Sequence, residues 1–196
     1  MTGRRTLARD ISVTGTALHA GTSVTMTLSP SASGAGIVFC RSDKANSEIP
    51  ARYDVVAETN FGTVIEKDGV KVGVIEHLMA AIAGAEIDDL LVTLDGPEPP
   101  ILDGDALSYF RLIEKTGTVQ QPGARTAIKV MRPVEIAIND ASTRLLPSDA
   151  LEYAYALDYT NTKAIGKQTY ATTLTRETFA REIAPARTFG FGHVRG

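Results

Sequence analysis

Glu76 and His77 stand side by side in the chain and could supply a general base next to a metal ligand. A positioned carboxylate can take a proton from water, and a neutral imidazole is the commonest metal ligand in proteins. A catalytic zinc ion normally takes three protein ligands and leaves a fourth position for water. The chain has only three histidines, His19, His77 and His193. The pair therefore suggests metal-dependent hydrolysis without completing a zinc site.

The best-known two-histidine zinc motifs are absent around this pair. The zincin motif needs a second histidine four residues after the first, where this chain has Ala81. The inverted motif needs a histidine at position 73, which is Gly73. A Glu-His pair on a helix is more often structural than catalytic, so the pair alone is weak support for an enzyme.

One apolar stripe predicts the helix that carries the pair. Its members recur at the helical spacing i, i+3, i+4, i+7 and are Ile75, Leu78, Met79 and Ile82. His77 lies off this stripe, in line with Ala80, Ala81 and Gly84. This row of small residues lets another surface or a ligand come close to the histidine.

Strand patterns surround this helix. Residues 23–28 alternate between apolar and small polar side chains, residues 36–40 form a short apolar run, and residues 90–94 have the pattern of a buried strand. An acidic loop rich in Pro and Gly follows at 95–105, and a second helical pattern lies around 109–114. The mixture predicts an α+β fold.

A polar stretch broken by Pro122 and Gly123 predicts a linker between two domains. We place the domains at 1–121 and 127–196, with the linker at 122–126. Beyond it, residues 128–130, 134–138 and 153–159 alternate like strands, and a helical pattern with a Thr start covers 175–183. The order of strands followed by a helix recurs on both sides, which indicates a weak structural repeat.

Composition narrows the class of function. The 196 residues are 43% hydrophobic and 22% charged, with a net charge of -3, so the whole chain has no electrostatic footprint for nucleic acid. No apolar run has the length of a transmembrane segment or a signal peptide. The single Cys40 excludes an internal disulfide and a Cys-rich zinc cage. We expect a soluble protein located in the cytoplasm.

Six segments in order resemble one family, the zinc-dependent UDP-3-O-acyl-N-acetylglucosamine deacetylases of lipid A biosynthesis. They are residues 15–21 (GTALHAG), 75–81 (IEHLMAA), 87–91 (IDDLL), 95–104 (DGPEPPILDG), 165–168 (IGKQ) and 186–191 (ARTFGF). Any one segment would be weak, but six in register span nearly the whole chain. The resemblance implies two domains that each pack a sheet against two helices, with the helices sandwiched between the sheets and the zinc at the domain junction.

The same resemblance implies roles for individual residues. Glu76 would be the general base that activates water, and His77 would be the first zinc ligand. The hydroxyl of Thr188 would face the tetrahedral intermediate and help to stabilise its oxyanion. His19 and Phe189 would bind the substrate, UDP-3-O-acyl-N-acetylglucosamine.

The sequence departs from the family pattern at its end, because the family's other two zinc ligands come from a later H-K-x-x-D segment that these 196 residues do not contain. We therefore expect an incomplete second domain and an inactive chain, which needs a missing C-terminal part or another chain to complete the site. A non-catalytic module that binds a sugar nucleotide or a protein partner, and one half of a split enzyme, are the alternatives.

Overall fold

The structure, a computed structural model, describes residues 3–159 and 163–188. The chain divides into two compact units. The first contains residues 3–125 together with 180–188, and the second is Thr126–Phe179.

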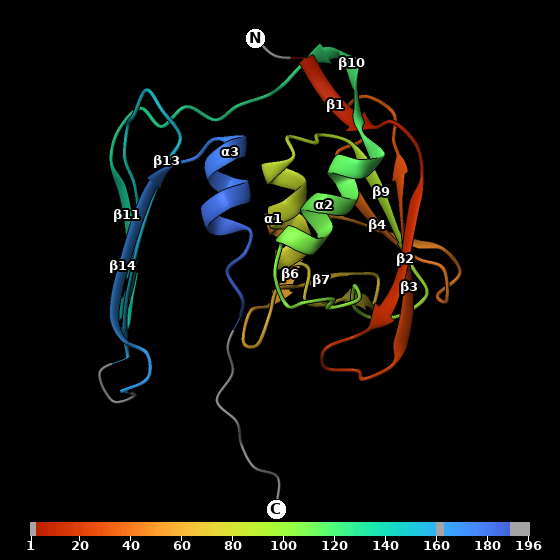
Figure 1. Cartoon of the computed structure of the whole chain (residues 1–196), viewed down its shortest axis with the longest axis horizontal. Helices are drawn as coiled ribbons and strands as arrows, with labels where there is room; N and C mark the ends of the chain where they lie inside the picture. The colour runs from red at the N-terminus through yellow and green to blue at the C-terminus, as the bar shows by residue number, and fades with distance from the viewer. Residues whose placement is uncertain (1–2, 160–162, 189–196) are drawn as a thin grey trace, which may run out of the picture. The chain divides into compact units, whose positions relative to one another are not determined.

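A five-stranded sheet forms the centre of the first unit, with the strand order β2-β3-β9-β4-β5 (Figure 1). The strands are β2 (Ile11–Thr16), β3 (Ser23–Pro30), β9 (Leu90–Leu94), β4 (Ile37–Arg41) and β5 (Ser47–Pro50). β9 pairs antiparallel with β3 and parallel with β4. Val24, Met26 and Leu28 are buried while their neighbours in β3 are not, which confirms the alternation predicted for residues 23–28.

Two helices, α1 (Glu76–Gly84) and α2 (Leu107–Thr116), lie side by side on one face of this sheet (Figure 1). The predicted stripe of α1 is largely confirmed, because Ile75, Leu78 and Ile82 are buried. α2 contributes Tyr109, among other buried residues, and ends at Gly117, whose φ of 79° falls in the region that favours glycine. The helices and the sheet thus share one apolar core, and the first turn of α1 lies at its edge.

Smaller sheets complete the first unit. One contains β6 (Val56–Glu58), β7 (Val64–Lys67) and β8 (Val70–Val72), preceded by the 3-10 turn η1 (Tyr53–Val55). The other pairs β1 (Gly3–Leu7) with β10 (Thr118–Ala124). Residues 122–124 of the predicted linker therefore belong to a strand, while the predicted domains 1–121 and 127–196 remain a prediction.

The second unit contains two separate two-stranded sheets. β11 (Val134–Ile138) pairs with β12 (Ala141–Leu145), and β13 (Glu152–Tyr159) pairs with β14 (Gly166–Thr173). The strand expected at 128–130 is wrong, because these residues have no regular structure. Ile128 is almost fully exposed there, so its alternation with polar neighbours has no buried face to support it.

A helical segment follows these sheets as predicted for residues 175–183. It consists of α3 (Arg176–Thr178) and the π-helical turn η2 (Phe179–Ile183). The Thr start is confirmed, because the side chains of Thr175 and Thr178 exchange hydrogen bonds with each other's backbone N–H groups.

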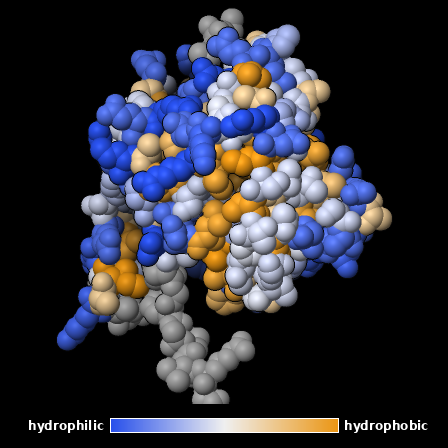
Figure 2. Space-filling view, turned by 45° about the vertical axis from the view of Figure 1, so that its right-hand side comes forward, coloured by the Kyte–Doolittle hydropathy of each residue, from blue (hydrophilic) through white to orange (hydrophobic). Residues whose placement is uncertain are grey.

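Most described side chains of the second unit are exposed, and many of them are apolar, including Val134, Ile136, Ile138, Tyr153 and Tyr155. Isolated two-stranded sheets have no packing layer of their own, so they leave such side chains uncovered. On the first unit, Figure 2 brings forward the side on which Figure 1 shows β2 and β3, and hydrophobic surface lies there between hydrophilic side chains. The presence of helices beside several sheets confirms the predicted α+β class.

None of the helices formed by residues 3–159 and 163–188 combines the length and apolar character that a membrane crossing requires.

Candidate active site at the start of helix α1

Glu76 is the first residue of α1, and its carboxylate is held by the loop between β6 and β7. Glu76 Oε2 accepts the backbone N–H of Thr63 at 2.8 Å. The carbonyl of Thr63 in turn accepts the N–H of Ile75 at 3.4 Å. A hydrogen bond to a charged acceptor contributes about 1.5–3 kcal/mol, more than a neutral one. The side chain is half-buried and therefore has a defined place at the helix start.

The turn that aims the helix at this loop passes through Val74, which has a φ of 54°. Left-handed backbone is rare for a β-branched residue and is strained there. Gly73 N–H donates to the carbonyl of Pro97 at 2.9 Å on one side of Val74, and the Ile75–Thr63 bond lies on the other. These flanking bonds stabilise the turn, so the direction of α1 is set by contacts with two loops.

Gly62 allows the close approach of the loop to Glu76. Its φ is 148°, and a Cβ built on it would lie 3.2 Å from Glu76 Oε1. We expect Gly62→Ala to displace the carboxylate and weaken the Thr63 N–H bond, so that the Thr63 amide exchanges its hydrogen roughly ten- to a hundredfold faster. Hydrogen exchange followed by NMR measures this rate.

Gly69→Ala is the matched control for that experiment. Gly69 also has a positive φ, 77°, but a Cβ there would meet nothing within 4 Å. Equal acceleration of Thr63 exchange in both variants would show that backbone strain, rather than contact with Glu76, controls this loop.

The phenol of Tyr109 feels the charges of two carboxylates, Glu76 and Asp105. Burial raises the pKa of Tyr109 far above its ordinary value, and the negative charges of Glu76 and Asp105 raise that pKa further. The phenol therefore stays protonated and donates to the carbonyl of Pro100. Asp105 is itself buried and accepts the N–H of Ser108 at 3.0 Å. A buried neutral hydroxyl thus lies within electrostatic reach of both carboxylates.

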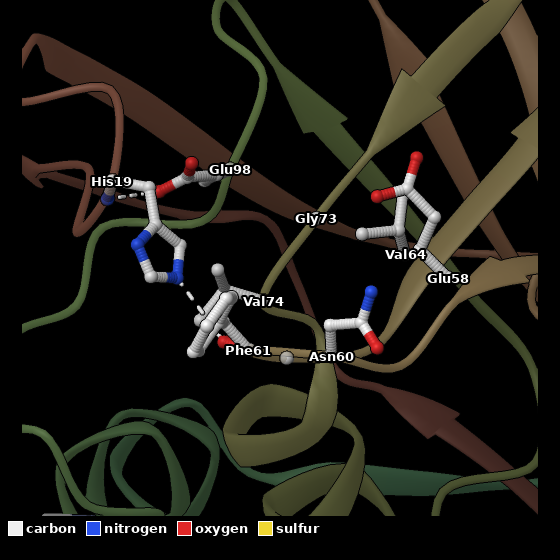
Figure 3. A pocket seen from close by; sticks show the side chains of 9 residues that line it. His19, Glu58, Asn60, Phe61, Val64, Gly73, Val74 and Glu98 are labelled. Carbon is white, nitrogen blue, oxygen red and sulfur yellow. Dashed lines mark hydrogen bonds between the residues drawn. The ribbon is translucent and has the colours of Figure 1, made fainter. Parts of the chain in front are cut away.

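A pocket of about 400 Å³ lies against the loop between β6 and β7, lined by His19, Glu58, Asn60, Phe61, Gly62, Val64, Gly73, Val74 and Glu98 (Figure 3). His19 is exposed, and its Nε2 lies 3.1 Å from the carbonyl oxygen of Phe61. The backbone N–H of His19 donates to Glu98 Oε2 at 2.9 Å. Since Gly62 touches both Glu76 and this pocket, His19 and Glu76 flank the same loop.

His77 is half-buried on the first turn of α1, next to Glu76. Its imidazole suits zinc, but a zinc site needs further donors. Nowhere in residues 3–159 and 163–188 do three His, Cys, Asp or Glu side chains gather closely enough to hold a metal ion. Cys40 is buried, and burial raises the pKa of its thiol, so it is not poised as a thiolate ligand. The described residues therefore do not fit a complete zinc site.

Thr188 is the last described residue, and its backbone N–H donates to the carbonyl of Gly104 at 3.2 Å. This bond joins it to the loop that contains Asp105. The Thr188 side chain is exposed. Phe189, the other residue predicted here, lies outside the described residues, as does His193.

Sequence reasoning singled out Glu76 and His19 but missed residues that contact them, namely Gly62, Thr63 and Glu98. Gly62 follows Asn60 and Phe61 in a stretch whose only signal is a glycine just before a strand. Glu98 stands in a loop of prolines, where a glutamate has no side-chain periodicity to mark it. The bonds they make cross 13 and 79 residues of sequence, and no local pattern reports such contacts.

Comparison with known proteins identifies the family. A family model described as LpxC, UDP-3-O-acyl N-acetylglycosamine deacetylase, matches residues 4–194. Two similar proteins, from a Nitratiruptor species and from Aliarcobacter butzleri, are named UDP-3-O-acyl-N-acetylglucosamine deacetylase. Each is 40% identical to this chain over a match that covers 97% of this chain and 63% of the relative. The one from Myxococcus xanthus is 40% identical over 96% of the chain and 60% of its own length. The chain thus spans about three-fifths of the length of these relatives, and it belongs to the UDP-3-O-acyl-N-acetylglucosamine deacetylase family.

Proposed function

We propose that this chain carries the general base and the first metal ligand of a zinc-dependent amide hydrolase. The reaction removes the N-acetyl group from UDP-3-O-acyl-N-acetylglucosamine in lipid A biosynthesis. One observation supports this most strongly: in a chain of this family, Glu76 is anchored beside His77 by the Thr63 N–H at 2.8 Å. An anchored carboxylate is what a base requires, since proton transfer depends on a fixed geometry.

In this proposal Glu76 takes a proton from the water that attacks the acetyl carbonyl. The carbonyl carbon becomes tetrahedral, and the Thr188 hydroxyl donates a hydrogen bond to its oxyanion. Glu76 then returns the proton to the leaving nitrogen as the C–N bond breaks, which yields acetate and a free amine. His19 and Phe189 bind the sugar nucleotide.

A zinc ion held there would polarise the carbonyl and would lower the pKa of the attacking water. His77 is the ligand that this chain supplies, and by the resemblance the other ligands come from the family's H-K-x-x-D segment. The donor set of the described residues is too small for a catalytic zinc site. A second polypeptide, or further residues of a longer protein, would complete it.

Zinc content and acetate release test the proposal together. We expect the 196-residue chain alone to retain well under one zinc ion per chain after dialysis, and to release no acetate, because one imidazole supplies a small share of the binding of a closed site. Fused to the part of the Nitratiruptor relative that it does not cover, it should bind one zinc ion and release acetate from UDP-3-O-acyl-N-acetylglucosamine. Metal analysis and an acetate assay give both values.

His77→Ala in the fused protein is the control, and it should remove both the zinc and the activity. A fused protein that binds zinc but deacetylates nothing would contradict the proposed reaction. One tightly held zinc ion on the 196-residue chain would instead show that the chain contains a complete ligand set. The cytoplasmic location expected from the sequence remains part of this proposal.

A further inference from the structure

Glu98 is a buried carboxylate whose position the surrounding chain fixes closely. It is 7% exposed and lies in the loop between β9 and α2, between two prolines that restrict the backbone on either side. The loop is tied at both ends, because Pro97 O accepts the Gly73 N–H at 2.9 Å and Pro100 O accepts the Tyr109 hydroxyl. These ties leave the Glu98 side chain little freedom to move.

The partner of this carboxylate is the turn between β2 and β3, which carries His19. Glu98 Oε2 accepts the His19 N–H at 2.9 Å, and the Ala17 N–H donates to Thr22 O at 2.9 Å across the same turn. The next residue after the prolines, Ile101, donates its N–H to Thr16 O at 2.9 Å. Two hydrogen bonds therefore join the Glu98 loop to the segment that carries His19.

The imidazole of His19 is held at a second point, where its Nε2 lies 3.1 Å from Phe61 O (Figure 3). A carbonyl oxygen can only accept a hydrogen bond, so Nε2 must carry the proton. In the neutral ring the proton on Nε2 leaves Nδ1 as an acceptor. Figure 3 shows this second nitrogen on the side of the ring turned away from Phe61.

We propose that Glu98 is a positioning residue for His19, and that the neutral imidazole it orients accepts a hydrogen bond through Nδ1 from a hydroxyl or N–H group of a sugar ligand. The identity of the ligand rests on the proposed deacetylase function, whereas the positioning rests on the geometry alone. Burying a carboxylate has a substantial free-energy cost, which a neutral side chain at this position would avoid. Glu98 also reaches farther than an aspartate, by one methylene group.

The tautomer of His19 tests the positioning directly. The 196-residue chain is labelled with 15N-histidine, the His19 signals are assigned with His19→Gln, and the 15N shifts are measured at a pH about two units above the ordinary imidazole pKa of about 6.5. We expect the ratio of the Nε2–H to the Nδ1–H tautomer to exceed that of free histidine about fivefold, the effect of one ordinary hydrogen bond. This readout requires no catalysis.

Three variants separate the hydrogen bond from the charge. Glu98→Gln keeps an acceptor oxygen at the same reach and should keep the ratio. Glu98→Ala and Glu98→Asp should both return the tautomer ratio to that of free histidine. Aspartate keeps the negative charge, but its shorter side chain does not reach His19 N. Glu48→Ala, at an exposed carboxylate on β5, is the control and should change nothing. If Glu98→Ala unfolds the chain, the tautomer ratios of Glu98→Asp and Glu98→Gln still show whether the hydrogen bond to His19 N sets the tautomer.

N-acetylglucosamine, which has both hydroxyl and N–H donors, tests the second half of the proposal. We expect its addition to shift the His19 Nδ1 resonance in the unsubstituted chain and to shift it at least severalfold less in Glu98→Asp. A tautomer ratio unchanged in both Glu98→Asp and Glu98→Ala would overturn the positioning role. An unmoved Nδ1 resonance at high sugar concentration would overturn the acceptor role. Neither result bears on the proposed deacetylase function, which the acetate assay tests separately.

Discussion

Glu76→Gln is expected to lower deacetylation by roughly 10²–10⁴-fold, with the zinc content unchanged, in the chain fused to the part of the Nitratiruptor relative that it does not cover. Glutamine has nearly the same shape as glutamate, and its amide oxygen can still accept the Thr63 N–H that Glu76 accepts at 2.8 Å. It cannot take a proton from water. The variant therefore removes the proposed proton transfer while it preserves the geometry of the helix start.

The measurement is the initial rate of acetate release at saturating substrate, together with metal analysis of the same samples. Glu48→Gln removes an exposed carboxylate from β5 and should leave the rate unchanged. Near-normal turnover in Glu76→Gln would show that Glu76 is not the base. Loss of zinc along with turnover would show instead that the carboxylate stabilises the metal site.

The sequence predicted well the elements whose side chains have one buried face. In α1 the spacing of Ile75, Leu78 and Ile82 matches the side that packs on the sheet, and the alternation in β3 matches the burial of Val24, Met26 and Leu28. In both elements the buried side fixes the periodicity, and the periodicity can be read in the chain.

Local composition does not reveal a strand that forms through long-range pairing. Pro122 and Gly123 have the composition of a linker, yet they lie in β10, which pairs with β1 more than 110 residues earlier in the chain. A proline fits there because each strand of a two-stranded sheet is an edge strand with free N–H positions. The strand at 118–124 is recognised only through its pairing with β1, and no local sequence pattern predicts that pairing.

In the candidate site too, local sequence predicts some features, while contacts between distant residues decide others. Glu76 and His77 are adjacent in sequence, so their joint position on the first turn of α1 follows once the helix is predicted. The loop that holds Glu76 depends on the left-handed backbone at Val74, which a β-branched residue rarely adopts. A propensity argument predicts against that conformation, and the contacts of Gly73 and Thr63 outweigh it.

Asp89→Ala is expected to have the largest effect on stability, a loss of about 3–5 kcal/mol in the free energy of unfolding. Asp89 has no exposed surface and binds Arg4 through two hydrogen bonds, Nε to Oδ2 at 2.8 Å and Nη2 to Oδ1 at 2.6 Å. It also accepts the N–H groups of Gly34 at 3.0 Å and Gly36 at 2.8 Å. Alanine would leave a largely buried guanidinium and two N–H groups without their acceptor.

Urea unfolding of the 196-residue chain measures this loss as a lower midpoint, by roughly 1–3 M. The control is Asp54→Ala, which breaks the ion pair of Arg52 and Asp54 between side chains that are 64% and 44% exposed. Exposed pairs contribute about 0–1 kcal/mol, so this midpoint should barely move. Equal shifts in the two variants would mean that the buried network around Asp89 contributes no more than a surface pair.

The contribution of Asp89 should also depend on pH in a defined direction. Burial opposes ionisation of this carboxyl, but the hydrogen bonds from Arg4, Gly36 and Gly34 outweigh burial and hold its pKa below the ordinary value. A group whose pKa is lower in the folded state stabilises that state above its unfolded pKa, about 3.9 for aspartate, and loses the contribution as the pH falls through the folded pKa. The difference in urea midpoint between the unsubstituted chain and Asp89→Ala should therefore be constant near neutral pH and shrink below about pH 4. A difference that grew on acidification would contradict a lowered pKa, because it would mean that the protonated carboxyl stabilises the fold more than the charged one.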